Sequence, residues 1–238
     1  MPRISVLIPV YNGERYLTEA LQSVLADHDS DLEVITVDDG STDQTPKILK
    51  DLAAGDNRLK VITRPNTGVV GALNDGLAAC TGEYIARMDA DDVVYLGRFQ
   101  AQQAYLDNHP ECVGLGSWVQ YLDPDGEPIW TWKMTADAKT IEDHLLNGTI
   151  GGLVHPAMML RREAVMAAGA YRQECQYVED YDLFLRLLEH GSFSVIEKCL
   201  LGYRQHLGSI NATKDQQTRT AITNRLLADA RSRRSLSP

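Results

Sequence analysis

The chain has 238 residues, of which 44% are hydrophobic and 24% are charged, a composition typical of a folded protein with one good core. Its formal net charge of -10 disfavours a nucleic-acid partner, because phosphate backbones are bound by clustered lysine and arginine. The four cysteines are widely separated and form no Cys-x-x-Cys pair, which argues against a zinc knuckle or redox motif and favours a reducing compartment.

The first 90 or so residues alternate apolar runs with amphipathic stretches, the pattern of strands that are buried on both faces and joined by helices. The runs predict strands over residues 4–10, 32–37, 59–63 and 84–88. Helices are predicted over residues 14–26 and after the capping residues Ser41, Thr42 and Asp43. We expect an α/β fold with a Rossmann-like, mostly parallel sheet and helices on both of its faces.

After Asp92 the rhythm of the sequence changes. It predicts a helix over residues 97–108, a hairpin of residues 113–122 and 128–134, a helix over 141–146, a strand over 155–160, a helix over 181–188 and an extended segment over 193–203. These elements predict a smaller mixed or antiparallel portion of the same single domain, residues 1–238.

The segment 212–238 is basic, unlike the rest of the chain, and Ile222, Leu226 and Ala230 fall at helical spacing in it. It is predicted to be a basic C-terminal helix or tail, which either packs on the domain or contacts an anionic membrane surface. The N-terminus leads directly into the first apolar run, and no apolar run approaches the length needed to span a bilayer. We therefore expect a cytoplasmic protein, with peripheral contact at the inner face of the membrane as the alternative.

The fourth predicted strand ends in three carboxylates within four positions, Asp89, Asp91 and Asp92. Like charges at close range resist joint ionisation, so the cluster predicts a metal, a shared proton or full solvation. Hard oxygen ligands favour Mg²⁺ or Mn²⁺, which leave coordination positions open for substrate phosphates. The alternative is a loop whose acids cap the next helix or face water.

Ligands of open parallel sheets bind beyond the carboxyl ends of the strands, where polar residues also follow the other three predicted strands. Asp39 could accept hydrogen bonds from a nucleobase or a ribose, or it could serve the helix N-terminus. Arg64 could balance a diphosphate or simply be solvated. The polar segments expected at this common edge are 9–13, 38–41, 64–68 and 89–92.

Candidates for catalysis follow later in the chain. Glu179 and Asp180 begin a predicted helix, where each is a candidate general base or a helix cap. His206 could supply an imidazole to a metal held by the acids, and His155, next to Pro156, could face the site. The predicted hairpin carries three tryptophans that could form a sugar-stacking platform or belong to a core or an interface: Trp118, Trp130 and Trp132.

Taken in order, these motifs resemble family 2 glycosyltransferases over residues 4–211. The resemblance rests on Pro-Val-Tyr-Asn at 9–12, Asp-Asp-Gly-Ser-Thr-Asp at 38–43, Arg-Pro-Asn-Thr-Gly at 64–68, Met-Asp-Ala-Asp-Asp at 88–92, His-Pro at 155–156 and Glu-Asp at 179–180. It implies a GT-A fold with a nucleotide-sugar-binding half over about residues 1–95 and an acceptor and catalytic half over about 96–211.

The resemblance also implies the roles of individual residues. The donor, a nucleoside-diphosphate sugar and most commonly a UDP-sugar, would be bound by Pro9, Tyr11, Asn12, Asp39, Arg64, Asn66, Gly68, Asp89 and Asp91. The metal, Mn²⁺ or Mg²⁺, would be held by Asp91, Asp92 and His206. Asp180 would be the general base, with Glu179 beside it, and a saccharide or lipid-linked acceptor would receive the sugar with inversion, in cell-surface polysaccharide or lipid-linked glycan synthesis.

One segment departs from the family pattern. Members often carry a proline and an acid before the arginine that follows the acidic cluster, whereas this chain has Tyr95-Leu96-Gly97 before Arg98. The start of the next helix is therefore left open.

Two other functions remain alternatives. One is a phosphohydrolase or phosphomutase with Asp89 as the nucleophile, and the other is a nucleotide-sugar-binding module without turnover. The sequence leaves the donor base, the sugar, the acceptor and the oligomeric state open.

Overall fold

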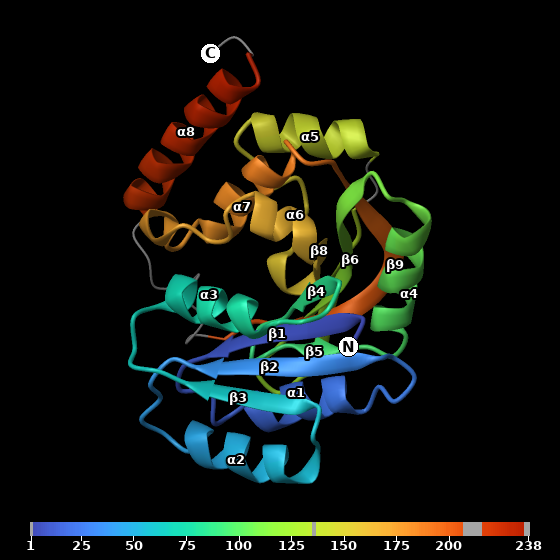
Figure 1. Ribbon diagram of the computed structural model, residues 1–238, viewed down its shortest axis with the longest axis vertical. Coiled ribbons are helices and arrows are strands. Elements are labelled where there is room, and N and C mark those ends of the chain that lie inside the picture. The colour runs from blue at the N-terminus through green and yellow to red at the C-terminus, as the bar shows by residue number, and fades with distance from the viewer. Residues whose placement is uncertain (1, 135–136, 207–215, 236–238) are drawn as a thin grey trace.

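The computed structural model describes residues 2–134, 137–206 and 216–235 (Figure 1). Its described strands form one continuous mixed sheet in the order β3-β2-β1-β4-β8-β6-β9-β5, with β7 paired to β6. Four neighbouring strands are parallel, as predicted: β3 (Leu59–Thr63), β2 (Leu32–Asp38), β1 (Ile4–Val10) and β4 (Tyr84–Arg87). Their carboxyl ends therefore share one edge of the sheet.

Helices cover both faces of this parallel part. Side chains alternate along β1, so Val6 and Ile8 pack in the same core cluster as Leu21 of α1 (Leu17–Leu25), whereas Leu7 packs with Leu73 of α3 (Val69–Ala79) on the other face. The helix α2 (Thr45–Gly55) contacts β3 and α1. Burial on both faces explains why all seven residues of β1 are buried and why the strand reads as one apolar run.

The second half of the chain adds the antiparallel portion. The strand β8 (Met159–Arg161) runs antiparallel to both β4 and β6 (Cys112–Leu122), and β6 forms the predicted hairpin with β7 (Pro128–Trp132). The long strand β9 (Ser192–Arg204) lies parallel to β6 and antiparallel to the short β5 (Val93–Val94). The sheet is therefore continuous from the first half of the chain to the second.

The helices of this half are α4 (Arg98–Asn108), α5 (Ala138–Leu146), α6 (Arg162–Ala167), α7 (Glu179–Leu187) and α8 (Gln216–Arg233). Gly97 precedes α4 with a φ of 81°, a left-handed conformation that glycine adopts without strain, so the helix starts at Arg98 without the family's proline. The prediction of a strand over 155–160 is wrong at its start. Residues His155–Ala157 form a 3-10 turn, since Pro156 cannot donate to a ladder, and pairing begins at Met159.

The described part of the basic C-terminal segment packs on the body of the protein beside α5 and α7 (Figure 1). Leu226 and Ala230 are buried, as their helical spacing predicts, and Arg231 Nε donates a 3.0 Å hydrogen bond to the carbonyl of Leu146. Arg233 forms an ion pair with Glu189 at 2.6 Å. Residues 216–235 pack on the domain, which is one of the two interpretations of this segment.

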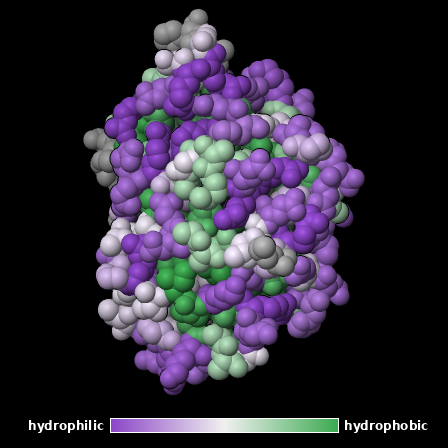
Figure 2. Space-filling model, viewed as in Figure 1, coloured by the Kyte–Doolittle hydropathy of each residue, from purple (hydrophilic) through white to green (hydrophobic). Residues whose placement is uncertain are grey.

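Hydrophilic side chains cover most of the face seen in Figure 1, and hydrophobic ones are visible along a band through its middle (Figure 2). Among the described residues, no helix combines the length and the apolar character that crossing a bilayer requires.

Candidate active site

A pocket of about 590 Å³ opens at the carboxyl edge of the parallel strands. Residues from both halves of the chain line it, including β1 and the turn after it, the end of β4, the start of α7 and the end of β9. The predicted site residues found in its wall are Pro9, Tyr11, Asn12, Asp89, Asp91, His155, Glu179, Asp180 and His206. The polar segments after β1 and β4 therefore share this pocket with the start of α7 and the end of β9.

The three acids after β4 form a compact oxygen cluster. One carboxylate oxygen from each of Asp89, Asp91 and Asp92 lies within 4.8 Å of the others. Asp92 is 1% exposed; its Oδ1 accepts a 3.0 Å hydrogen bond from the backbone N–H of Arg204, and its Oδ2 is buried with no hydrogen-bond partner among the described residues. Burial, followed by the charges of Asp89 and Asp91, raises the pKa of Asp92 well above its usual value.

These observations fit a divalent cation. A buried, orphaned carboxylate oxygen beside two further carboxylates is an unfavourable arrangement unless a proton or a cation neutralises it, and the all-oxygen set suits Mg²⁺ or Mn²⁺. His206 lies at the same place, with its Nε2 2.8 Å from Asp91 Oδ2 and its ring 4.8 Å from that of Tyr16. The residues predicted to hold the metal are thus brought together.

Arg87, the last residue of β4, is a member of the site that sequence reasoning missed. Its side chain is 5% exposed and lines the pocket, and its Nη2 lies 2.5 Å from Asp89 Oδ1. Its Nε and Nη1 are buried and have no hydrogen-bond partner in the described part of the chain. The sequence contained a signal for Arg87, because a charged residue in the otherwise apolar strand β4 needs a counter-charge or a hydrogen-bond acceptor when it is buried.

Glu179 and Asp180 open α7 at the other side of the pocket. Burial, followed by the charge of Asp180, raises the pKa of Glu179 to about 7. Burial also raises the pKa of Asp180, against a 2.7 Å hydrogen bond from the backbone N–H of Tyr181 and the positive charge of Arg87. A carboxyl group that titrates near neutral pH is suited to proton transfer. Neither acid caps the helix, since the N-cap position is Val178 and has no side-chain cap.

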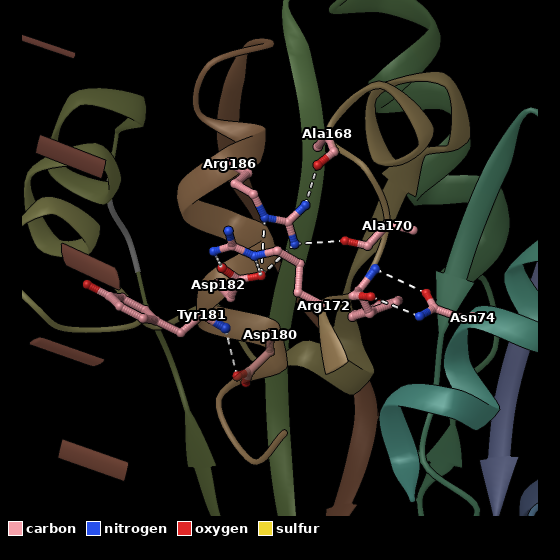
Figure 3. A network of polar contacts seen from close by, with 9 residues as sticks. Asn74, Ala168, Ala170, Arg172, Asp180, Tyr181, Asp182 and Arg186 are labelled. Atoms are coloured by element: carbon pink, nitrogen blue, oxygen red, sulfur yellow. Dashed lines mark hydrogen bonds and ion pairs between the residues drawn. The ribbon is translucent and has the colours of Figure 1, made fainter. Parts of the chain in front are cut away.

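A buried polar network fixes α7 against its neighbours (Figure 3). Arg172 and Arg186 converge on Asp182, which is 1% exposed, with Arg186 Nη2 2.6 Å from Asp182 Oδ2. Arg186 also donates 2.7 Å to the carbonyl of Ala170. Burial acts to raise the pKa of Asp182, but its hydrogen bonds with the two arginines lower it overall. This network sets the orientation in which α7 presents its first two residues to the pocket.

Four residues predicted to contact the donor do not line this pocket, and their role stays a prediction: Asp39, Arg64, Asn66 and Gly68. Asp39 is 3% exposed, and its two carboxylate oxygens accept hydrogen bonds from the backbone N–H groups of Thr67 at 3.2 Å and Gly68 at 2.9 Å. Arg64 lies 3.4 Å from Asp39 and 3.2 Å from Asp75. These contacts connect the end of β2 to the loop after β3.

The tryptophans do not form one platform. Trp130 and Trp132 lie on β7 opposite Tyr121 and Val119, and Trp130 stacks on Tyr121 with ring centroids 4.4 Å apart. Trp118 points to the other face of the hairpin, because adjacent strand residues alternate. There its indole N–H donates 2.8 Å to the carbonyl of Met134. Of this aromatic group, Tyr121 lines the pocket, and none of the three tryptophans does.

His155 lies in the pocket wall as predicted. It is 5% exposed, its Nε2 lies 2.9 Å from the hydroxyl of Tyr171, and burial together with the charge of Arg87 lowers its pKa well below the usual value. It is therefore a neutral hydrogen-bonding group at neutral pH.

Pocket-lining residues that sequence reasoning missed, besides Arg87, include Tyr16, Tyr121, Tyr203, Arg204 and Arg219. Tyr16 immediately precedes α1, whereas the fold brings the other four in from β6, β9 and α8.

Residues 5–169 match the family model described as "Glycosyl transferase family 2". A similar protein is the "Putative glycosyltransferase EpsE" of Bacillus subtilis, which is 33% identical over 194 residues, or 80% of this chain and 68% of that protein. The chain spans about two thirds of the length of such relatives.

Two solved structures share the fold. S. aureus TarS 1-349 in complex with UDP-GlcNAc aligns with a TM-score of 0.78 and 24% identity, over 96% of this chain and 65% of that one. The mannosyltransferase PcManGT from Pyrobaculum calidifontis, in complex with GDP-Man and Mn²⁺, aligns with a TM-score of 0.65 and 15% identity, over 98% of this chain and 75% of that one.

Proposed function

Because the chain belongs to glycosyl transferase family 2, we propose that its pocket transfers a sugar from a nucleoside-diphosphate sugar to an acceptor hydroxyl. The α/β GT-A fold expected from the sequence is confirmed. The observation that carries the proposal is that Asp89 and Asp91 of the oxygen cluster line the same pocket of about 590 Å³ as Glu179 and Asp180. A donor diphosphate and an acceptor hydroxyl can meet there.

On the donor side, Pro9, Tyr11 and Asn12 flank the base and ribose, in the half formed by about residues 1–95. Asp91, Asp92 and His206 hold the cation, Mn²⁺ or Mg²⁺, with Asp89 supporting the turn. When bound, the cation supplies positive charge that stabilises the departing diphosphate. The orphaned oxygen of Asp92 supports this assignment, because it is a ligand atom without any other partner in the described residues.

On the acceptor side, in the half formed by about residues 96–211, Asp180 is the general base. It takes the proton of the acceptor hydroxyl while that oxygen forms a bond to the anomeric carbon, and the bond from this carbon to the diphosphate oxygen breaks. One displacement inverts the anomeric configuration. Glu179, His155 and Tyr121 complete the wall against which the acceptor lies.

We propose UDP as the donor's nucleotide, since a structure with the same fold binds UDP-GlcNAc. GDP-sugars are the alternative donors to test, because the PcManGT structure contains GDP-Man. The acceptor is a saccharide or a lipid-linked glycan, the class implied by the motif resemblance. Phosphoryl transfer through Asp89 loses its support, because that carboxylate is already paired with Arg87 and the family is shown.

Thermal-shift titration of the purified protein with UDP, GDP and their sugars, each with and without Mn²⁺, tests the proposal. A ligand that binds the native state raises its melting temperature. We expect a Mn²⁺-dependent rise for one nucleotide and its sugars. Release of free UDP or GDP from the matching sugar nucleotide in the presence of acceptors then separates an active enzyme from a binding module. No rise for any nucleotide would overturn the assignment.

A further inference from the structure

Four arginines line the pocket, and three of them already have a carboxylate partner. Arg87 pairs with Asp89 at 2.5 Å, and Arg204 pairs with Glu19 at 2.7 Å. The third, Arg15, pairs with Asp125 at 3.4 Å. Arg219 also lines the pocket, and its guanidinium makes no hydrogen bond or ion pair with residues 2–134, 137–206 or 219–235. Among those residues its charge has no partner that a ligand would have to displace.

The position of Arg219 is set by the anchoring of α8. Figure 1 shows this helix with its N-terminal end toward the sheet and its C-terminal end away from it. Leu226 and Ala230 are buried against the body, and Arg231 is hydrogen-bonded to the carbonyl of Leu146. Arg219, in the first turns of the helix, is thus held at the pocket by contacts on later turns.

Within the pocket, Arg219 belongs to the side of the general base. Its positive charge acts on Asp180, where it opposes the effect of burial on the pKa of that carboxyl. Its helix, α8, packs on α7, which carries Glu179 and Asp180 at its start. A ligand group beside Arg219 therefore lies on the side of the pocket where the acceptor hydroxyl is proposed to bind.

We propose that Arg219 binds an anionic group of the acceptor, a phosphate or a carboxylate, and so selects an anionic glycan or a phosphorylated carrier over a neutral sugar. The inference rests on the proposed function, because it names the class of acceptor for the same site. A guanidinium offers paired N–H donors that match the oxygens of either anion.

Inorganic phosphate is the probe for this site. The protein is first saturated with UDP and Mg²⁺, so that the donor diphosphate site is filled, and phosphate is then titrated at constant ionic strength. Calorimetry or thermal shift gives the dissociation constant for wild type, Arg219→Gln and Arg219→Lys. Arg225→Gln is the matched control, because Arg225 lies on the same helix, is exposed and does not line the pocket.

We expect Arg219→Gln to weaken phosphate binding at least tenfold, Arg219→Lys to weaken it less, and Arg225→Gln to leave it unchanged. The affinity for UDP with Mg²⁺ should be equal in all four proteins. Equal phosphate affinity in wild type and Arg219→Gln, or no phosphate binding by wild type, would overturn the inference. A tenfold loss of UDP affinity in Arg219→Gln would also overturn it, by placing the donor at Arg219. Failure of wild type to bind UDP would instead count against the proposed function.

Discussion

The guanidinium of Arg87 lies 2.5 Å from the carboxylate of Asp89, and this ion pair joins the end of β4 to the acidic turn that follows it. Arg87 is also the cation whose charge lowers the pKa values of Glu179 and Asp180 across the pocket, against the burial that raises both. One buried arginine therefore influences the groups assigned to the donor and the groups assigned to the acceptor. Its removal should disturb both sides of the reaction.

We expect Arg87→Met to lower kcat/KM by about 100-fold, the usual scale for a lost electrostatic contact in an active site. Without the positive charge, the pKa of the Glu179–Asp180 pair rises, so the acid limb of the pH–rate profile moves to higher pH. In wild type this limb should lie above the usual pKa of an aspartate, because burial raises the pKa of both acids. Arg87→Lys should restore part of the rate. A profile that does not move in Arg87→Met would contradict this role.

Asp180→Asn removes the proposed base and keeps its shape. Transfer should fall by on the order of 100-fold or more, while UDP affinity measured by calorimetry stays within about twofold, because only proton transfer is lost. Glu174→Gln is a matched control, since this acid lies on the 3-10 turn Gln173–Cys175 shortly before α7 and is exposed. Normal transfer by Asp180→Asn would defeat the assignment of the base.

Glu179→Gln should stabilise the fold in a pH-dependent way. The folded-state pKa of about 7 lies above the usual value of 4.5, so the native state holds this proton more tightly than the unfolded chain does. Ionised Glu179 therefore destabilises the fold progressively from pH 4.5 to about 7, and fully above that. The variant should melt at a higher temperature than wild type at pH 8 and at the same temperature at pH 4. An equal difference at both pH values would show that ionisation is not the cause.

Asp182→Asn should destabilise the protein by about 3 kcal/mol, because it leaves the guanidinium groups of Arg172 and Arg186 without their buried counterion. Urea unfolding followed by circular dichroism measures this. The control is Asp143→Asn, which breaks the exposed pair with Lys139 and should cost less than about 1 kcal/mol. Similar losses in the two variants would mean that the network of Figure 3 does not hold α7 in place.

Much of the fold could be predicted because its signals are local. Strands buried on both faces appear as apolar runs, so β1 and β3 were predicted at their observed bounds. The acidic turn and the pair at the start of α7 were found for the same reason, since each is a short run of one kind of residue. The strand predicted from His155 was wrong at its start, because a proline interrupts the pairing.

Other features of the site depend on contacts that no local pattern contains. Asp39 is bound by backbone N–H groups of a loop 28 and 29 residues further along the chain. Trp118 faces away from Trp130 because of the pairing register of β6 and β7, and Arg219 enters the pocket through the packing of a distant helix. In each case the decisive partner is set by tertiary structure.

The most direct test of the central claim, that one pocket unites a cation-dependent donor site with the base, is UDP affinity with and without Mn²⁺ in wild type, Asp92→Asn and Asp180→Asn. We predict that Mn²⁺ strengthens UDP binding at least tenfold in wild type and Asp180→Asn but not in Asp92→Asn, and that both variants lose transfer. Undiminished enhancement by Mn²⁺ in Asp92→Asn would contradict the account.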